Sequence, residues 1–337
     1  MAGKLLTPAQ VAERLGVTPR TVARYIQSGQ LPASATIGGH ARVQEADLDS
    51  FMGGGHPPPD TAIVTVIANQ KGGVGKTTLT ANLGVLLWQM GLRVLLVDLD
   101  PQGHLTFTMG HNPDALPRTI YEAMLNAREI PATEVIVPTT FGPDLAPINI
   151  AATDADIELS RKALWGTCLK TVLGGVQRHY DYILIDSAPN LSKLTVNAFM
   201  AGDYVVIPTQ LEMLSVRGLR LLLNRIEEAR AEANPRLQIA GAVATMAQAI
   251  NANRTMEISL RQALGSGGIH AFRTVIKNGA EFKDVANQRS VLVSANPRSP
   301  HAESYRHLLV ELLGVIGGPG QALSDQLAAG PAVSAVG

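Results

Sequence analysis

The chain of 337 residues has a single cysteine, Cys168, and no excess of charge of either sign. One thiol cannot form a disulfide framework, and by itself it cannot hold a metal ion or an iron–sulfur cluster, so we interpret Cys168 as a buried or idle thiol. Lys and Arg total 28, as do Asp and Glu, so no net charge attracts DNA or an anionic membrane. Any binding of nucleic acid must therefore come from local clusters of basic side chains.

The sequence also lacks a long apolar run. No stretch approaches the roughly 20 apolar residues of a membrane span, and the first residues, MAGKLLTPAQ, contain no apolar core of a signal peptide. We therefore expect a cytoplasmic protein. The length exceeds what one hydrophobic core usually serves, so about two domains are expected.

A stretch rich in glycine and proline, GGGHPPPD at residues 53–60, marks the expected domain boundary. Its glycines favour a flexible chain and its prolines a stiff extended one, which is typical of a linker. It separates an N-terminal domain, residues 1–52, from a larger domain, residues 61–316. The remaining residues, 317–337, are rich in Gly, Pro, Ala and Ser and are expected to be disordered.

The N-terminal domain contains the pattern of two short helices joined by a tight turn. Residues 7–15 and 19–27 are predicted helices, with Gly16 and Val17 in the turn between them and Thr18 at the cap of the second. The second helix is expected to turn Val22 and Ile26 inward, so its polar side chains face outward. These side chains, with Arg42 on a later strand, are candidate ligands of specific DNA: Arg20, Thr21, Arg24 and Tyr25.

The pattern of helix, turn, helix, Gly-Gly hairpin and a final DLDSF resembles the winged helix-turn-helix of the MerR and excisionase group over residues 1–52. The resemblance implies that the second helix enters a major groove and that the hairpin touches the DNA backbone. A small module that binds protein is the alternative, because five basic and four acidic residues leave a net charge of only about +1. The arginines clustered on the second helix favour DNA.

The octet KGGVGKTT, residues 71–78, directly follows the apolar run AIVTVIAN and is predicted to bind phosphate. Its glycines lack a Cβ, so the backbone can wrap an anion and aim successive N–H groups at it. In the general P-loop pattern Lys76 binds the β- and γ-phosphates and the Thr77 hydroxyl ligates Mg²⁺. The candidate ATP-binding residues of the octet are Gly72, Gly73, Val74, Gly75, Lys76, Thr77 and Thr78.

One position departs from the general pattern. Gln70 stands where a glycine is expected, and Lys71 follows it. A lysine at the start of the loop is poorly placed to fold back onto the phosphates that the loop wraps, so it could serve a neighbouring subunit's nucleotide. The alternative is an ordinary solvated lysine at the edge of a loop.

Apolar strand-like runs alternate with helical stretches throughout the larger domain. This alternation predicts an α/β fold with a parallel sheet, helices on both faces and ligands at the carboxyl ends of the strands. Asp98, Asp100 and Asp186 end two of these runs. A carboxylate near a triphosphate repels it unless Mg²⁺ intervenes, so we expect at least one of the three on the metal or its waters and a remaining one to orient a water. Asp98 and Asp186 are the candidate metal ligands. A single aspartate at such a position is more often a cap or turn former.

The motifs KGGVGKTT, DLDPQG, ILIDSAP and PTQLE, in this order, resemble the ParA branch of the ParA/MinD group of deviant Walker ATPases. The resemblance extends from about Ile63 to Gly314. It implies a slow ATPase with Mg²⁺ in which two subunits enclose two ATP molecules and Lys71 reaches the partner's phosphates. It also implies that Asp100 positions the attacking water and that Asp186 acts through metal-bound water.

The same resemblance implies an adenine site near Pro208, Thr245 and Met246. His104 is a departure, since the family usually has Asn at this position. Basic residues of the C-terminal part are candidates for binding DNA without sequence preference, although solvated helix faces have similar composition. They are Lys277, Lys283, Arg289, Arg298 and Arg306.

Taken together, the two resemblances imply a plasmid or chromosome partition protein. It would form a homodimer with ATP, associate with the nucleoid and be stimulated by a ParB-like centromere-binding partner. A MinD-like membrane protein would end in a basic amphipathic helix, but QALSDQLAAGPAVSAVG has no basic residue, so no membrane binding is expected. The rival interpretation is a transcription regulator switched by nucleotide, without a role in partition.

Overall fold

The computed structural model describes residues 5–15, 22–23, 26, 31, 33–35, 41–45, 48, 61–190, 192–210, 216–247, 261–262, 264–265 and 267–320. In the N-terminal part, helix α1 (Pro8–Leu15) accompanies a three-stranded antiparallel sheet of order β1–β3–β2. Its strands are β1 (Leu5–Leu6), β2 (Ser34–Ala35) and β3 (Ala41–Gln44). Helix α1 starts in a capping box, because Gln10 N donates to Thr7 Oγ1 at 3.2 Å and Thr7 N donates to Gln10 Oε1 at 2.9 Å.

A small apolar core holds this N-terminal part together. Val22 is fully buried in it and Ile26 packs against it, which confirms the predicted inward direction of both side chains. Arg42 is half-buried on β3. The linker 53–60 and four predicted DNA ligands lie outside the described residues: Arg20, Thr21, Arg24 and Tyr25.

The larger domain is built on an eight-stranded sheet of order β11–β10–β9–β4–β8–β5–β7–β6. Its pairs are parallel except β6 with β7, so the predicted parallel sheet is confirmed with one antiparallel edge pair. The strands are β4 (Ile63–Ile67), β5 (Val94–Leu99), β6 (Val137–Pro138), β7 (Asp144–Ala146), β8 (Tyr182–Ser187), β9 (Tyr204–Gln210), β10 (Gln238–Ala247) and β11 (Ala271–Lys277).

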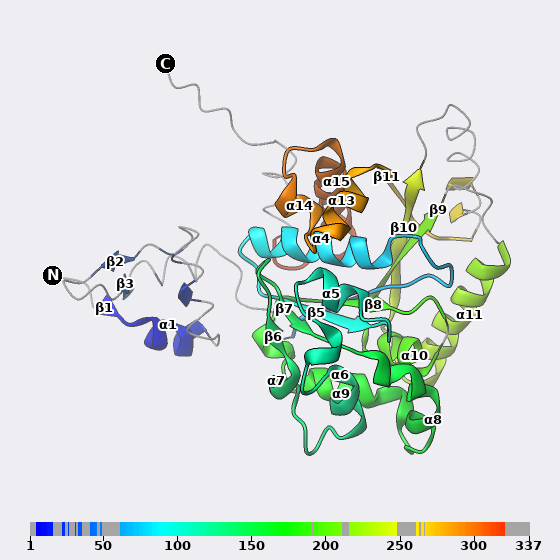
Figure 1. The fold of residues 1–337 in the computed structure, drawn as a ribbon, viewed down its shortest axis with the longest axis horizontal. Coiled ribbons are helices and arrows are strands. Elements are labelled where there is room, and N and C mark those ends of the chain that lie inside the picture. The colour runs from blue at the N-terminus through cyan, green and yellow to red at the C-terminus, as the bar shows by residue number, and fades with distance from the viewer. Residues whose placement is uncertain are drawn as a thin grey trace.

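Helices cover both faces of this sheet (Figure 1). One face carries α4 (Lys76–Gln89), α5 (His104–Thr108), α13 (Glu281–Asn287), α14 (Leu292–Ala295) and α15 (Pro300–Ile316). The other carries α6 (Ile120–Leu125), α7 (Ala132–Val135), α8 (Ala155–Ser160), α9 (Cys168–Gly174), α10 (Lys193–Ala201) and α11 (Val216–Glu232). Short 3₁₀ helices occur at η1 (Pro113–Ala115), η2 (Ile150–Asp154), η3 (Trp165–Thr167) and η4 (Gln177–His179).

The central strands are apolar on both sides because both sides are covered. In β5, Leu95 and Val97 face the α6–α11 layer, while Val94 and Leu96 face the α4 layer. The first strand, β4, lies between β8 and β9, so the chain moves to one side of β4 and later to the other. Such a reversal of strand order opens a crevice at the carboxyl ends of the strands. No helix among the described residues is long and apolar enough to cross a membrane.

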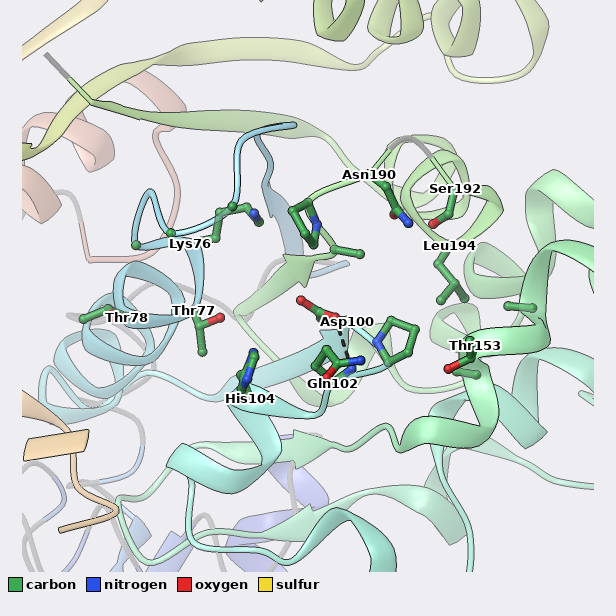
Figure 2. A pocket seen from close by; sticks show the side chains of 18 of the residues that line it. Lys76, Thr77, Thr78, Asp100, Gln102, His104, Thr153, Asn190, Ser192 and Leu194 are labelled. Atoms are coloured by element: carbon green, nitrogen blue, oxygen red, sulfur yellow. Dashed lines mark hydrogen bonds between the residues drawn. The ribbon is translucent and has the colours of Figure 1, made fainter. Parts of the chain in front are cut away.

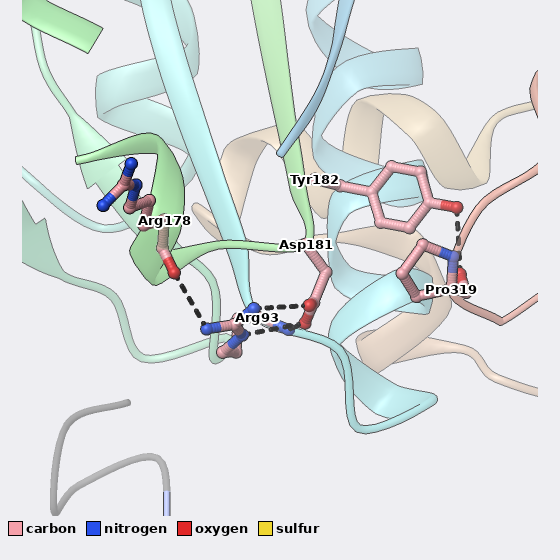
Figure 3. Close-up of polar contacts among 5 residues, drawn as sticks. All are labelled: Arg93, Arg178, Asp181, Tyr182 and Pro319. Atoms are coloured by element: carbon pink, nitrogen blue, oxygen red, sulfur yellow. Dashed lines mark hydrogen bonds and ion pairs between the residues drawn. The ribbon is translucent and has the colours of Figure 1, made fainter. Parts of the chain in front are cut away.

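The starts of β5 and β8 are joined by a buried ion pair (Figure 3). Arg93 Nη2 lies 2.7 Å from Asp181 Oδ1, and the two side chains are only 3% and 7% exposed. Arg93 N and Nε both donate to Asp181 Oδ2, at 2.6 and 3.1 Å, and Arg93 Nη1 donates to the Arg178 carbonyl at 3.2 Å. Both charges are therefore satisfied by hydrogen bonds.

The first residues of the segment expected to be disordered, 317–320, pack against the larger domain. The Tyr182 hydroxyl lies 3.0 Å from the Gly317 carbonyl oxygen and 2.9 Å from that of Pro319, and Pro319 and Gly320 are buried (Figure 3). Composition alone misses this segment because its order comes from packing on the starts of β4 and β8. Residues 321–337 lie outside the described residues.

Candidate functional site

The loop between β4 and α4 has the backbone of an anion-binding site. Gly73 and Gly75 have φ values of 71° and 83°, in the left-handed region that glycine adopts without steric cost. Helix α4 starts at Lys76 with Gly75 as its N-cap, and no side chain caps its first N–H groups. These N–H groups and the positive end of the helix dipole are thus available to a phosphate.

The two lysines of the octet differ in burial and in their contacts. Lys76 is 7% exposed, and its Nζ lies 3.4 Å from the Lys71 carbonyl oxygen. Burial lowers the pKa of Lys76, although Asp186 and Asp100 act to raise it. Lys71 is exposed, and its Nζ donates to Gln210 Oε1 at the end of β9. The inner lysine therefore belongs to its own loop, while the outer one is accessible to a second molecule.

Thr77 and Asp186 form the polar centre beneath the loop. Thr77 Oγ1 donates to Asp186 Oδ2 at 2.6 Å, and the fully buried Asp186 Oδ1 has no hydrogen-bond partner among the described residues. Burial, together with the nearby Asp98 carboxylate, raises the pKa of Asp186 well above its ordinary value. An unpartnered buried carboxylate oxygen beside a threonine hydroxyl suits a Mg²⁺ ion that also takes phosphate oxygens and water.

Asp98 has other partners. Its Oδ2 accepts from the backbone N and the hydroxyl of Thr106, both at 2.8 Å, and its Oδ1 accepts from Asp100 N at 3.2 Å. Burial raises the pKa of Asp98 to about 7, although the hydrogen bonds from Thr106 act to lower it. Neither Asp98 nor Asp186 lines the cavity described below, so both assignments as metal ligands stay predictions. The contacts of Asp98 indicate that it holds α5 in place.

A cavity of about 700 Å³ opens in front of the loop (Figure 2). Asp100 is 8% exposed and lies on its wall, and its Oδ1 accepts from Gln102 N at 3.1 Å. The volume is within the range of small-molecule sites. The lining residues from the octet are Gly72, Gly73, Gly75, Lys76, Thr77 and Thr78.

The far wall of this cavity was not predicted from the sequence. Thr153, Asp156, Asn190 and Ser192 line it, and the Ser192 hydroxyl is a buried oxygen without a hydrogen-bond partner among the described residues. Figure 2 shows Thr153, Asn190 and Ser192 across the cavity from the octet. These residues carry no recognisable motif, and only the fold brings them opposite the loop.

Of the three predicted adenine contacts, only Met246 lines the cavity. Thr245 Oγ1 donates to the Val74 carbonyl at 2.8 Å, and the Pro208 carbonyl accepts from Asn69 Nδ2 at 2.6 Å. Both residues therefore brace the loop, and their adenine role stays a prediction. Val74 is buried beneath the loop, so its side chain does not face a phosphate.

The predicted basic residues of the C-terminal part have different environments. Lys277, Lys283 and Arg298 are exposed. Arg306 is half-buried, and its Nη1 lies 2.8 Å from Glu303 Oε2. The Arg289 guanidinium lies over the Phe107 ring, 4.3 Å from its centroid. Arg289 is also exposed, so four of the five cations reach solvent, and two of the five, Arg289 and Arg306, contact neighbouring side chains.

Comparison with known proteins identifies both parts of the chain. Residues 62–239 match the family described as AAA domain, and residues 5–55 match the helix-turn-helix domain family. The chain is 35% identical over 250 residues to the sporulation initiation inhibitor protein Soj of Bacillus subtilis, covering 74% of this chain and 97% of Soj. It is 41% identical over 186 residues to the chromosome partitioning protein ParA of Caulobacter vibrioides, covering 54% and 69%.

A solved structure shares the fold and holds nucleotide. The structure named cobyrinic acid a,c-diamide synthase from Mycobacterium smegmatis, with bound ATP analogue and magnesium, is 32% identical, with a TM-score of 0.66 over 74% of this chain and 92% of that one. The predicted fold class is confirmed by this likeness and by the sheet order. The chain therefore belongs to the AAA-domain family of ParA/MinD-like P-loop NTPases and carries an N-terminal helix-turn-helix domain.

Proposed function

We propose that this protein is an ATP-dependent DNA partition ATPase. Mg-ATP binds at the Lys71–Thr78 loop, Thr77 ligates the metal, and Asp186 acts on it directly or through a bound water. Asp100, on the cavity wall, orients the attacking water. When bound, Mg²⁺ neutralises the charge that develops on the phosphates during hydrolysis.

The main support for this proposal is that the two lysines of the octet have different environments. Lys76 is buried inside the loop and would hold the phosphates of its own subunit. Lys71 is exposed at the mouth of the loop and makes its side-chain hydrogen bond to Gln210, which a second molecule's phosphates can replace. ATP binding would therefore create a homodimer in which each Lys71 serves the partner's nucleotide.

Two variants test the dimer. Lys71→Ala should still bind ATP but remain monomeric in Mg-ATP, whereas Asp100→Ala should bind ATP and accumulate as a dimer because hydrolysis is blocked. Sedimentation velocity with and without Mg-ATP measures both. Lys170→Ala is the matched control, because this exposed lysine of α9 lies near Asp203 at the starts of β4 and β9, away from the loop. A normal ATP-dependent dimer of Lys71→Ala would contradict the crossing role, and a monomeric Asp100→Ala would contradict the role of Asp100.

DNA binding is proposed at two places. The N-terminal domain would bind a specific site, as an autorepressor or at the partition locus, and exposed C-terminal lysines and arginines would bind nucleoid DNA without sequence preference in the ATP dimer. Deleting residues 1–55 should abolish specific binding and leave ATP-dependent non-specific binding intact. If non-specific binding is lost as well, the C-terminal basic residues are only a solvated surface.

The second candidate is a nucleotide-switched transcription regulator, which the helix-turn-helix domain favours. The two candidate functions differ in how ATP hydrolysis responds to a partner and DNA. A partition ATPase should hydrolyse ATP slowly, and a ParB-like centromere-binding partner together with DNA should accelerate it. A regulator should change its affinity for an operator with nucleotide and need no partner. Steady-state hydrolysis with and without the partner and DNA separates them.

A further inference from the structure

Helix α5 lies between the nucleotide cavity and the C-terminal part of the chain. Its first and last residues, His104 and Thr108, line the cavity. The ring of Phe107, 38% exposed, carries the guanidinium of Arg289 at 4.3 Å from its centroid. This distance is that of a cation–π contact. One short helix therefore touches both the proposed ATP site and a proposed DNA contact.

Arg289 occupies a backbone position that normally favours glycine. Helix α13 ends in a turn in which Ser290 N donates to the Val285 carbonyl at 3.0 Å, and Arg289 within it has a φ of 49°. Glycine is usual at this left-handed position after a helix, and a side chain there costs stability. An arginine in strained backbone is a reason to examine what its side chain does.

Hydrogen bonds connect the segments that carry Phe107 and Arg289 to elements beside the cavity. Thr106, next to Phe107, is held by the Asp98 carboxylate at the end of β5. On the other side, Val293 N, four residues after Arg289, donates to Asn82 Oδ1 on α4, the helix that begins at the loop. The Phe107–Arg289 contact is therefore connected by hydrogen bonds to the end of β5 through Thr106 and to α4 through Val293.

We propose that Phe107 withholds Arg289 from DNA until nucleotide binds. Filling the cavity moves α5 and releases the guanidinium, which then contacts a DNA phosphate; Arg289 is thus a DNA ligand and Phe107 its positioning residue. This inference rests on the proposed ATP-dependent DNA binding. Without nucleotide, DNA must first break the contact, and that cost lowers affinity in this state only.

Non-specific DNA binding of the full chain tests the proposal. Phe107→Leu keeps an apolar side chain without a ring face and should raise the DNA affinity of the nucleotide-free protein about two- to fivefold, the value of an exposed cation–π contact. It should leave the affinity in Mg-ATP unchanged. Phe107→Tyr, which keeps the ring face, is the matched control and should behave as wild type. In an Arg289→Gly background Phe107→Leu should have no effect.

Fluorescence anisotropy of a labelled duplex lacking any specific site measures these affinities. Equal effects of Phe107→Leu with and without nucleotide, or none in either state, would overturn the proposal. A titration with a fluorescent ATP analogue shows that each variant still binds nucleotide.

A second readout needs no DNA. In Phe107→Trp the emission of the new indole, taken as the difference from wild type, should change on saturating Mg-ATP, and Arg289→Gly should remove most of that change. An unchanged emission would overturn the release of Arg289. If wild type binds DNA equally with and without ATP, the proposed function fails, and the emission alone then decides whether nucleotide opens the contact.

Discussion

Two groups of buried charges lie at opposite ends of the same two strands, β5 and β8. At the starts of the strands, Arg93 and Asp181 form an ion pair in which the polar atoms of both side chains have hydrogen-bond partners. At the ends, Asp98 and Asp186 are both fully buried and both have raised pKa values. One oxygen of Asp186 has no partner among the described residues.

The difference separates a structural cluster from a functional one. A buried ion pair with complete hydrogen bonding holds strand starts in register and does not require a ligand. Two buried carboxylates with raised pKa values resist ionisation, and a bound divalent cation would stabilise their charged forms. We call Arg93 with Asp181 the complete cluster, which holds the sheet together, and Asp98 with Asp186 the incomplete cluster, at the end of the strands where we propose that Mg-ATP binds.

The largest effect on stability is expected from breaking the ion pair of the complete cluster. Arg93→Met leaves Asp181 buried without its cation and should lower the free energy of unfolding by about 3–5 kcal/mol. The double variant Arg93→Met/Asp181→Asn keeps an acceptor for the backbone N–H of residue 93 and should recover most of the loss. Urea unfolding measures both. A loss below about 1 kcal/mol in the single variant would contradict the structural role.

In the absence of ligand, the contribution of the incomplete cluster to the stability of the protein should depend on pH. Because the pKa of folded Asp98 is about 7 and that of the unfolded side chain about 4, its contribution to stability is complete below about pH 4 and lost as pH rises through 7. Between about pH 5 and pH 8 wild type should lose about 2–3 kcal/mol relative to Asp98→Asn. Urea unfolding in EDTA measures this difference, and a pH-independent difference would rule out the raised pKa.

A smaller effect is expected at Thr77. Thr77→Val removes the one hydrogen-bond donor to the Asp186 side chain among the described residues. It should lower the ligand-free stability by about 1–2 kcal/mol, since Asp186 can take up a proton in compensation. Thr77→Ser keeps the hydroxyl and should match wild type in thermal unfolding. If Thr77→Ser is as destabilised as Thr77→Val, the methyl packing of Thr77 matters more than its hydrogen bond.

The sequence predicts the incomplete cluster and the loop beside it better than it predicts the complete cluster. Phosphate binding uses local geometry, so Lys76 and Thr77 stand in one octet, and apolar runs identify β5 and β8 with the carboxylates that follow them. Arg93 and Asp181 are 88 residues apart, and each looks like an ordinary charge before a strand. Their pairing depends on strand order, which no local pattern contains.

Other features were also not predicted, because no local sequence pattern indicates them. Strands β6 and β7 have two and three residues, too few for a periodic pattern. Gln210 stands in the PTQLE motif and was assigned no role, yet its Oε1 accepts from Lys71 Nζ and its Nε2 donates to the Gly73 carbonyl at 3.2 Å. Phe107 attracted no functional prediction because a phenylalanine on a short helix usually belongs to the core.

Isothermal titration calorimetry of the full chain with ATP, with and without Mg²⁺, tests most directly whether the incomplete cluster belongs to a magnesium–nucleotide site. We predict that Mg²⁺ tightens ATP binding at least about tenfold, equivalent to about 1.4 kcal/mol, and that Asp186→Asn removes most of this gain. Equal affinity with and without Mg²⁺ in wild type would contradict the account.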